Sequence, residues 1–265
     1  MKYFTKEWYK KMQHTCLYTG LKVNNKAEEN SEDFYLELYI ETKKRYVKDL
    51  SIFTDYKKFK KNYLENIDDY KDLKEEDIKQ EFIKSKEKMF FGMSIEEHFN
   101  YLQNDLIKEY KMNIPENILK KVKDIRVLAL GCVSSEVYKL LKEYSATNIK
   151  FVKEKIREYA KVEEEQFKNE SIEFVEESFH DCFVVDVIKE KIDLVIKLDN
   201  EPGFTDKTKI IFKNYSIILD EDIKETHWLY NEVYKNKDRY EVHILTAVND
   251  CLKELIIECE DIIIK

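Results

Sequence analysis

The hydrophobic pattern of the chain changes character at about residue 170. Before that point apolar side chains recur three and four positions apart, which places them on one face of an α-helix. From Phe179 onward apolar and polar residues alternate, as in half-buried strands. We therefore predict an α+β protein with an N-terminal antiparallel helical array and a C-terminal antiparallel β-sheet, sandwich or open barrel. The expected domains are residues 1–170 and 171–265.

Local signals mark the ends of about seven predicted helices. Ser31 is an expected N-cap, and Ser94 to Glu97 has capping-box spacing. Gly92 is expected to close the helix before that box. Because these helices have short connections, antiparallel neighbours are expected. Further helices are predicted from Ile52 to about Tyr70, from Pro115, from Ser134 or Ser135, and from Thr147.

The segment from Ile125 to Gly131 allows two interpretations. A strand, a glycine turn and a helix start would suit a nucleotide-binding unit, but the fingerprint needs further glycines where Cys132 and Val133 stand. We favour the other interpretation, a buried helix that Gly131 ends in a left-handed conformation.

Six to eight strands are predicted in the last 95 residues. Their short connections permit antiparallel pairing only, since parallel pairs need long crossovers. The interval from Ile217 to Thr226 is expected to be a solvated loop or a single helical turn, and Pro202 with Gly203 the centre of a type II turn. Trp228, Tyr230 and Tyr234 are expected to form one aromatic face that packs within the sheet or against the helices.

Charge is distributed unevenly between the two parts. The chain has 46 basic and 54 acidic residues, a net charge of −8. Residues 171–265 hold 12 basic and 22 acidic residues, a net charge of −10, so the acidic excess lies there. This excludes a generally basic nucleic-acid binder. The cluster from Lys57 to Lys61 surrounds Phe59 and is interpreted as the solvated face of a helix.

Cysteines and hydrophobic runs suggest a compartment but no cofactor. The five cysteines contain no CxxC pair, which argues against a disulfide framework or a zinc ribbon, and Cys132 and Cys182 are expected to be small buried side chains. The opening residues hold no apolar signal segment, and no stretch is long enough to span a membrane. We expect a cytoplasmic protein without a cofactor.

Histidine is the natural place to seek chemistry, because it titrates near neutral pH. His98 follows Glu96 and Glu97 in what we interpret as a solvated helix start. Sheet pairing could bring His180 near His243, and with Asp181 or Glu241 this would give a divalent-metal set; the hydrolase alternative uses His180, Asp181 and His243. The spacing does not demand that pairing, and a structural role at a strand start is favoured.

The opening run from Met1 to Gln13 (MKYFTKEWYKKMQ) resembles the start of a functionally uncharacterised family of bacterial proteins, found in Bacillus-like and Clostridium-like bacteria. The resemblance implies no activity and no catalytic residue. More loosely, a Phe-His-Asp strand start at Phe179 resembles small immunity proteins of toxin systems, which implies an acidic, non-enzymatic role. The family resemblance extends to Phe204-Thr205-Asp206, Ile211-Phe212-Lys213-Asn214 and Trp228-Leu229-Tyr230.

The sequence combines an acidic excess in residues 171–265 with the absence of any strong catalytic motif. The function predicted from the sequence is therefore a non-enzymatic protein-binding module, immunity-like in character, whose acidic β domain engages a basic partner. Two alternatives stay open: the metal-dependent hydrolase, and a structural protein whose acidity serves only solubility. The expected contact residues are Asp220, Glu221, Asp222 and Glu225.

Overall fold

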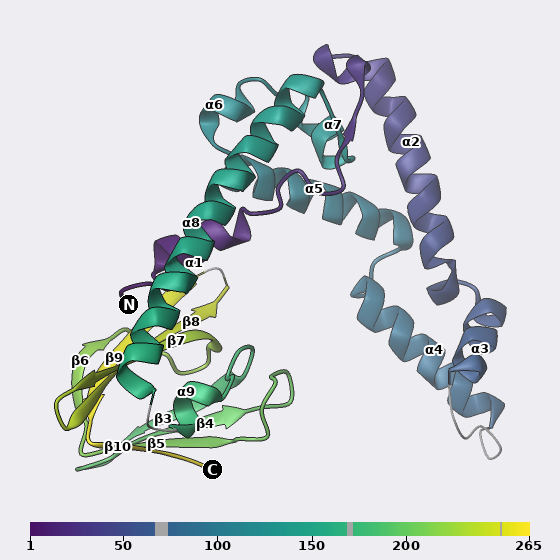
Figure 1. Cartoon of the computed structure of the whole chain (residues 1–265). Coiled ribbons are helices and arrows are strands. Elements are labelled where there is room, and N and C mark those ends of the chain that lie inside the picture. Colours follow the sequence, from purple (N-terminus) through teal and green to yellow (C-terminus); the bar gives the residue numbers. More distant parts are fainter. Residues whose placement is uncertain (67–73, 169–171, 250) are drawn as a thin grey trace. The chain divides into compact units, whose positions relative to one another are not determined.

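The computed structural model describes residues 1–66, 74–168, 172–249 and 251–265. The contacts divide the chain into two units (Figure 1). Unit 1 comprises Met1–Thr15 with Ser145–Lys265, and unit 2 comprises Cys16–Tyr144. The predicted boundary at residue 170 lies outside the described residues. The sheet thus shares its unit with the first residues of the chain, which lie more than a hundred positions away in sequence.

Unit 2 is mainly helical. The single helix predicted from Ile52 is interrupted: Ile52 lies in a 3-10 turn that ends at Phe53, and α3 begins separately at Tyr56 after its N-cap Asp55. The predicted end at Tyr70 lies outside the described residues. A two-residue parallel pair, β1 with β2, is the only strand pairing in the described part of this unit. The elements are β1 Lys22–Val23, η1 Asn25–Glu28, α2 Glu32–Asp49, η2 Leu50–Phe53, α3 Tyr56–Glu65, α4 Glu75–Phe90, α5 Ile95–Asn113, α6 Glu116–Leu119, α7 Ile125–Ala129 and β2 Cys132–Val133.

The predicted helix signals of unit 2 are confirmed. The Ser31 hydroxyl accepts the Phe34 N–H at the start of α2. Ser94 and Glu97 form the capping box of α5, with distances of 3.2 and 2.8 Å. The prediction of a solvated helix start holds for Glu96 and Glu97, which are exposed, and is wrong for His98. His98 is 4% exposed, because α5 packs against α2 and the His98 Nδ1 lies 2.5 Å from the Tyr46 hydroxyl.

The segment around Gly131 is helical, as we favoured. α7 is followed by Leu130 and then by Gly131 at φ +80°, a conformation that glycine adopts without strain. Strand β2 begins directly afterwards, and the Lys22 N–H donates to the Gly131 carbonyl at 2.8 Å. The turn at Gly131 therefore connects α7 to the β1–β2 pair within unit 2.

A single helix replaces the two predicted after Ser134 and Thr147. α8 spans Ser135–Phe167, and its residues up to Tyr144 belong to unit 2 while the rest belong to unit 1. No Gly or Pro stands between these ends, so Thr147 is an interior residue and not a cap.

Unit 1 holds an eight-stranded antiparallel sheet in order β10-β5-β4-β3-β7-β8-β9-β6, which confirms the α+β class. The prediction of a loop or helical turn from Ile217 is wrong in its first part, since β6 pairs there with β9. The elements are α1 Lys6–Gln13, α9 Glu173–Glu176, β3 Phe183–Lys189, β4 Leu194–Asp199, β5 Lys209–Lys213, β6 Ser216–Asp220, β7 His227–Asn236, β8 Arg239–Val248, β9 Cys251–Cys259 and β10 Asp261–Ile264.

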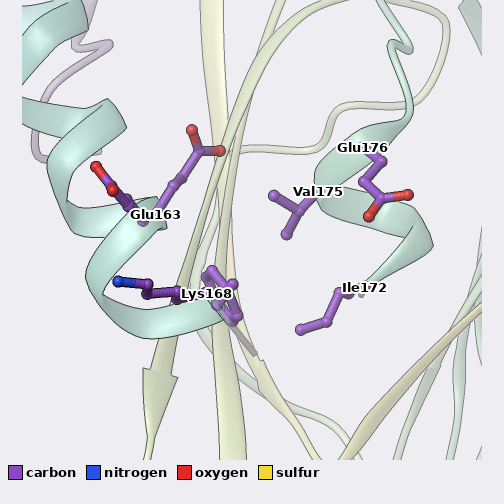
Figure 2. A pocket seen from close by; sticks show the side chains of 7 residues that line it. Glu163, Lys168, Ile172, Val175 and Glu176 are labelled. Atoms are coloured by element: carbon purple, nitrogen blue, oxygen red, sulfur yellow. The ribbon is translucent and has the colours of Figure 1, made fainter. Parts of the chain in front are cut away.

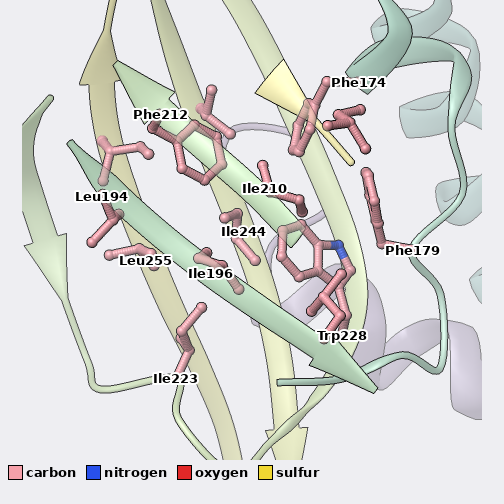
Figure 3. Packing of buried hydrophobic residues seen from close by; sticks show 14 of the residues in the cluster. Phe174, Phe179, Leu194, Ile196, Ile210, Phe212, Ile223, Trp228, Ile244 and Leu255 are labelled. Carbon is pink, nitrogen blue, oxygen red and sulfur yellow. The ribbon is translucent and has the colours of Figure 1, made fainter. Parts of the chain in front are cut away.

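The sheet folds over its own hydrophobic core. Strands β3 and β7 join the two halves of the sheet through a short contact centred on the bridge between Phe183 and His227, which neighbouring backbone hydrogen bonds extend on both sides. Aliphatic side chains of both halves meet between them, and Phe174 of α9 packs on the same core (Figure 3). The buried thiols of Cys182 and Cys259 belong to this core, which confirms the prediction for Cys182; Cys132 is likewise buried in unit 2.

The predicted aromatic face is divided between the two sides of β7. A register shift between Trp228 and Tyr230 turns Trp228 into the core and leaves Tyr230 and Tyr234 on the outer side. There the two tyrosines pack against Phe4 and Trp8 of the N-terminal segment. This outer layer is completed by residues of α8.

The predicted type II turn at Pro202 and Gly203 is wrong. The Gly203 N–H donates to the Asn200 carbonyl at 3.0 Å, so Glu201 and Pro202 are the central residues of the turn. A side chain at Gly203 is excluded for another reason: a Cβ there would overlap the Sγ of the fully buried Cys182.

Candidate functional site

A pocket of about 230 Å³ lies in unit 1 where α8 ends and α9 begins (Figure 2). We call it the acidic pocket. Its wall is apolar on the side of α9, and three of its lining side chains are glutamates. In Figure 2 the side chain of Lys168 extends away from Ile172 and Val175. The lining residues are Glu163, Glu164, Phe167, Lys168, Ile172, Val175 and Glu176.

Glu163 is held in place from the sheet. The backbone N–H of Val233 on β7 donates to the hydroxyl of Tyr159 at 2.8 Å, and that hydroxyl is hydrogen-bonded to Glu163. Tyr159 is 5% exposed, so it cannot easily rotate away. Burial raises the pKa of the Glu163 carboxyl above its usual value, although the bond from Tyr159 opposes this shift.

The pocket offers an anionic group beside an apolar wall. A lysine or arginine side chain lays its aliphatic stem along apolar surface and keeps its charged head near a carboxylate. Volumes below about 300 Å³ are small for drug-sized ligands but suit one such side chain. A cation placed here would also favour the ionised form of Glu163, which burial disfavours. The geometry therefore suits a basic side chain.

The acidic residues predicted to contact a partner are partly neutralised within the chain. Asp220 is paired with Lys189, and Glu221 with Lys6 at 2.6 Å. These ammonium groups hold the pKa of each carboxyl below its usual value. Asp222 and Glu225 are exposed and adopt left-handed backbone conformations, with φ of 54° and 58°. Among the described residues neither of these two carboxylates forms an ion pair, although that of Asp222 accepts the Lys224 N–H at 3.4 Å.

The residues of the predicted metal set do not converge. The His180 ring contacts Tyr230, whereas the His243 ring contacts Tyr234 four residues further along β7. At about 3.3 Å per residue this separates the two contacts by roughly 13 Å. Asp181 lies 3.0 Å from His180 Nδ1, whereas Glu241 lies 2.6 Å from His243 Nε2, so each carboxylate contacts a different histidine. In the described part of the chain, no group of three or more His, Cys, Asp or Glu could hold a metal ion.

A buried carboxylate that the sequence pattern did not single out organises the outer face of β7. Glu232 is fully buried and accepts the backbone N–H groups of Lys2 and Tyr3, both at 2.8 Å, and of Phe4. The Tyr234 hydroxyl donates to it at 2.7 Å. Its position in a strand of alternating pattern, in the sequence Tyr-Asn-Glu-Val-Tyr, would have been read as solvent-facing. Its partners come from the far end of the chain, so no local signal marks it.

Glu163 was missed for a related reason. It begins a run of three glutamates on a long helix, and such runs are usually solvated. The basic cluster of α3 did follow its prediction, since Phe59 is buried and stacks on Tyr63 while the lysines around it face outward or pair.

Comparison with known proteins identifies a family but no activity. The sequence model of one family, described as a protein of unknown function (DUF4085), matches residues 56–257. The match begins after the opening motif of the chain and covers more than half of its length. No curated protein and no solved structure matches the chain. Among the described helices, none combines the length and apolar character needed to cross a bilayer.

Proposed function

The chain belongs to this family of proteins of unknown function, as expected from the sequence, and we propose a function for it. We propose that the protein is a non-enzymatic protein-binding module. In this proposal the acidic pocket of unit 1 receives a lysine or arginine side chain of a basic partner. Glu163 binds the charged head, and the apolar wall formed by Ile172 and Val175 contacts the stem.

The observation that carries this proposal is the environment of Glu163. Glu163 forms no ion pair among the described residues, since Lys168 lines the same pocket without pairing with it. A half-buried carboxylate in that state is costly to ionise, and a partner that supplies a paired cation removes that cost. The surrounding charge supports it, because the net −10 of residues 171–265 attracts a basic surface from a distance. Exposed Asp222 and Glu225 would contribute to this attraction.

An immunity-like role is one form of this proposal. A protein that covers the basic surface of a toxin needs binding residues but no catalytic ones, as the loose resemblance at Phe179-His180-Asp181 implies. The partner's chemistry is the same in every form of the proposal: a protein segment with exposed lysine or arginine.

A lysine-bearing peptide tests the pocket directly. Binding of a fluorescently labelled oligolysine peptide is measured by anisotropy at low and moderate salt, beside the same peptide with every lysine acetylated. Acetylation keeps the aliphatic stem and removes the charge. Glu163→Gln is expected to weaken binding of the charged peptide by about tenfold, the value of a charge-assisted hydrogen bond.

Glu165→Gln is the matched control, because Glu165 is an exposed glutamate of the same helix that does not line the pocket. It should change the affinity by less than about twofold. Equal losses in the two variants, or equal binding of the acetylated peptide, would show that the pocket does not recognise a basic side chain. Asp220→Lys combined with Asp222→Lys separates long-range attraction from the pocket: it should weaken binding at low salt much more than at moderate salt.

The metal-dependent hydrolase remains a second proposal from the sequence, and the separation of His180 from His243 does not favour it. Metal analysis of protein purified without chelator or affinity-tag metal tests it. A stoichiometric divalent ion that is lost in His180→Ala would support the hydrolase, and a metal content at background would remove it.

A further inference from the structure

A second and larger concave site lies in unit 2, apart from the acidic pocket. It is a groove of about 700 Å³ between α2 and the β1–β2 pair. Its floor is made of buried Leu130 and Cys132 with Gly131 between them, and its rim carries three basic side chains. We call it the cationic groove. Its lining residues are Lys22, Val23, Asn24, Leu38, Glu41, Lys44, Arg45, Leu130, Gly131 and Cys132.

The basic side chains of this groove differ from their neighbours in having no carboxylate partner. Among the described residues no ion pair involves Lys22, Lys44 or Arg45, and the one recorded side-chain bond of Arg45 is to the Thr42 hydroxyl. Lysines close by in sequence are engaged instead. Lys43 pairs with Glu96 at 3.2 Å, and Lys26 with Glu37 at 3.0 Å.

The groove therefore gathers three uncompensated positive charges around a single carboxylate, that of Glu41. Like charges held together in a concavity raise the local positive potential, since the low-dielectric walls focus the field. The chain as a whole has an excess of carboxylates, with a net charge of −8. At this groove, however, the single carboxylate of Glu41 cannot neutralise three basic side chains. An external anion would complete the charge balance.

We propose that the cationic groove binds a small phosphorylated molecule. Arg45 offers a planar fork suited to two phosphate oxygens, while Lys22 and Lys44 act as point charges. Inorganic phosphate alone would leave most of the groove empty, because volumes of about 300–1,000 Å³ hold drug-sized ligands. The apolar floor at Leu130 and the side chains of Val23 and Leu38 would contact the uncharged body of the ligand.

The size and charge of the groove together define the ligand class. It carries at least two phosphate charges and an apolar or aromatic body about as large as a nucleoside. The proposal concerns unit 2 alone and is independent of the proposed function, so either can fail without the other.

Calorimetric titration with three probes tests it: inorganic pyrophosphate, ADP and adenosine. ADP is expected to bind most tightly, pyrophosphate more weakly, and adenosine without phosphate not measurably. Lys44→Ala and Arg45→Ala should each weaken ADP binding by about tenfold or more, because each removes a charged hydrogen-bond donor. Both residues are exposed, so these variants should fold normally.

Two further variants make the test specific. Lys43→Ala removes the same charge one position away but outside the groove, and should leave the affinity within about twofold. Glu41→Gln removes the opposing carboxylate and should tighten binding, a gain that misfolding cannot produce. The proposal is overturned if neither pyrophosphate nor ADP binds, if adenosine binds as well as ADP, or if Lys43→Ala weakens ADP binding as much as Lys44→Ala.

Discussion

The buried carboxylate of Glu232 accepts the backbone N–H of Phe4, and this bond joins residues 228 positions apart. The same carboxylate accepts the N–H groups of Lys2 and Tyr3. The segment preceding α1 is therefore fixed to β7 through its main chain, and its side chains need only to pack. Phe4 and Trp8 then cover Tyr230 on the outer face of the sheet.

Replacement of Glu232 by Gln should destabilise unit 1 strongly. An amide presents one oxygen where the carboxylate presents two, so at least one buried N–H loses its acceptor. We expect a loss of about 2–4 kcal/mol in the free energy of unfolding. Urea denaturation followed by tryptophan fluorescence measures it, because both tryptophans, Trp8 and Trp228, lie buried in unit 1.

Exposed Glu7 provides the control for this change. It lies on α1 close to the same segment and makes a surface pair with Lys11. Glu7→Gln should change the stability by less than about 0.5 kcal/mol. If Glu232→Gln also lowers the free energy of unfolding by less than about 0.5 kcal/mol, the hydrogen bonds to the Glu232 carboxylate contribute little to stability.

His243 should make the stability of unit 1 sensitive to acid. Burial lowers the pKa of its imidazole, although Glu241, 2.6 Å from Nε2, and Glu232 favour the protonated form. Lys2 faces the same cluster through its pair with Glu241 at 2.9 Å. A depressed histidine pKa gives stability that is present above about pH 6.5 and is lost as the pH falls through the folded value.

His243→Gln should therefore flatten the stability profile between about pH 7 and about pH 5.5, as measured by urea denaturation at several pH values. His227→Gln is the control, because His227 is exposed. If the two variants retain the same acid sensitivity as the unsubstituted protein, His243 does not contribute to it.

Glu163 should have the opposite pH dependence. Burial raises the pKa of its carboxyl, so its contribution to stability is present at acid pH and is lost as the pH rises through the folded value. Glu163→Gln should accordingly stabilise unit 1 at neutral pH and have less effect near pH 4. The measurement is the midpoint of thermal unfolding at the two pH values, with Glu165→Gln for comparison. A destabilised Glu163→Gln at neutral pH would contradict this account.

Gly203→Ala should disturb the core through Cys182. The added Cβ would overlap the Cys182 Sγ and lie 3.2 Å from the Cys182 nitrogen, and the fully buried thiol has no room to move. We expect a loss of about 1–3 kcal/mol, as for overpacked cores. In a Cys182→Ala background the loss should be smaller, because the sulfur is gone. Additive effects of the two changes in a double-mutant cycle would show that this contact is not the cause.

Local signals in the sequence sufficed for many elements. The caps at Ser31 and Ser94 use hydrogen bonds within one turn, and the helix end at Gly131 depends on one residue's backbone freedom. Such features need no distant partner, so they could be predicted. The break expected at Thr147 failed because a polar residue only permits a helix start, while the surrounding pattern continued the helix.

Features that depend on strand register were harder to predict. One extra residue in β7 turns Trp228 inward and Tyr230 outward, although both have the same parity in sequence. The hydrophobic pattern cannot reveal such a shift, since it is decided by pairing with β8. The pairing of β6 with β9 was missed in the same way, because its exposed isoleucines follow no clear alternation.

By itself the sequence determined the α+β class, the helix caps and the location of the acidic excess, all of which follow from neighbouring residues or composition. Only the tertiary structure decided which charges are compensated. It paired Asp220 and Glu221 with lysines, left Glu163 half-buried in a pocket, and gathered Lys44 and Arg45 in a groove. The physical reason is that a charge's energy depends on its burial and its nearest partners, and these come from distant parts of the chain.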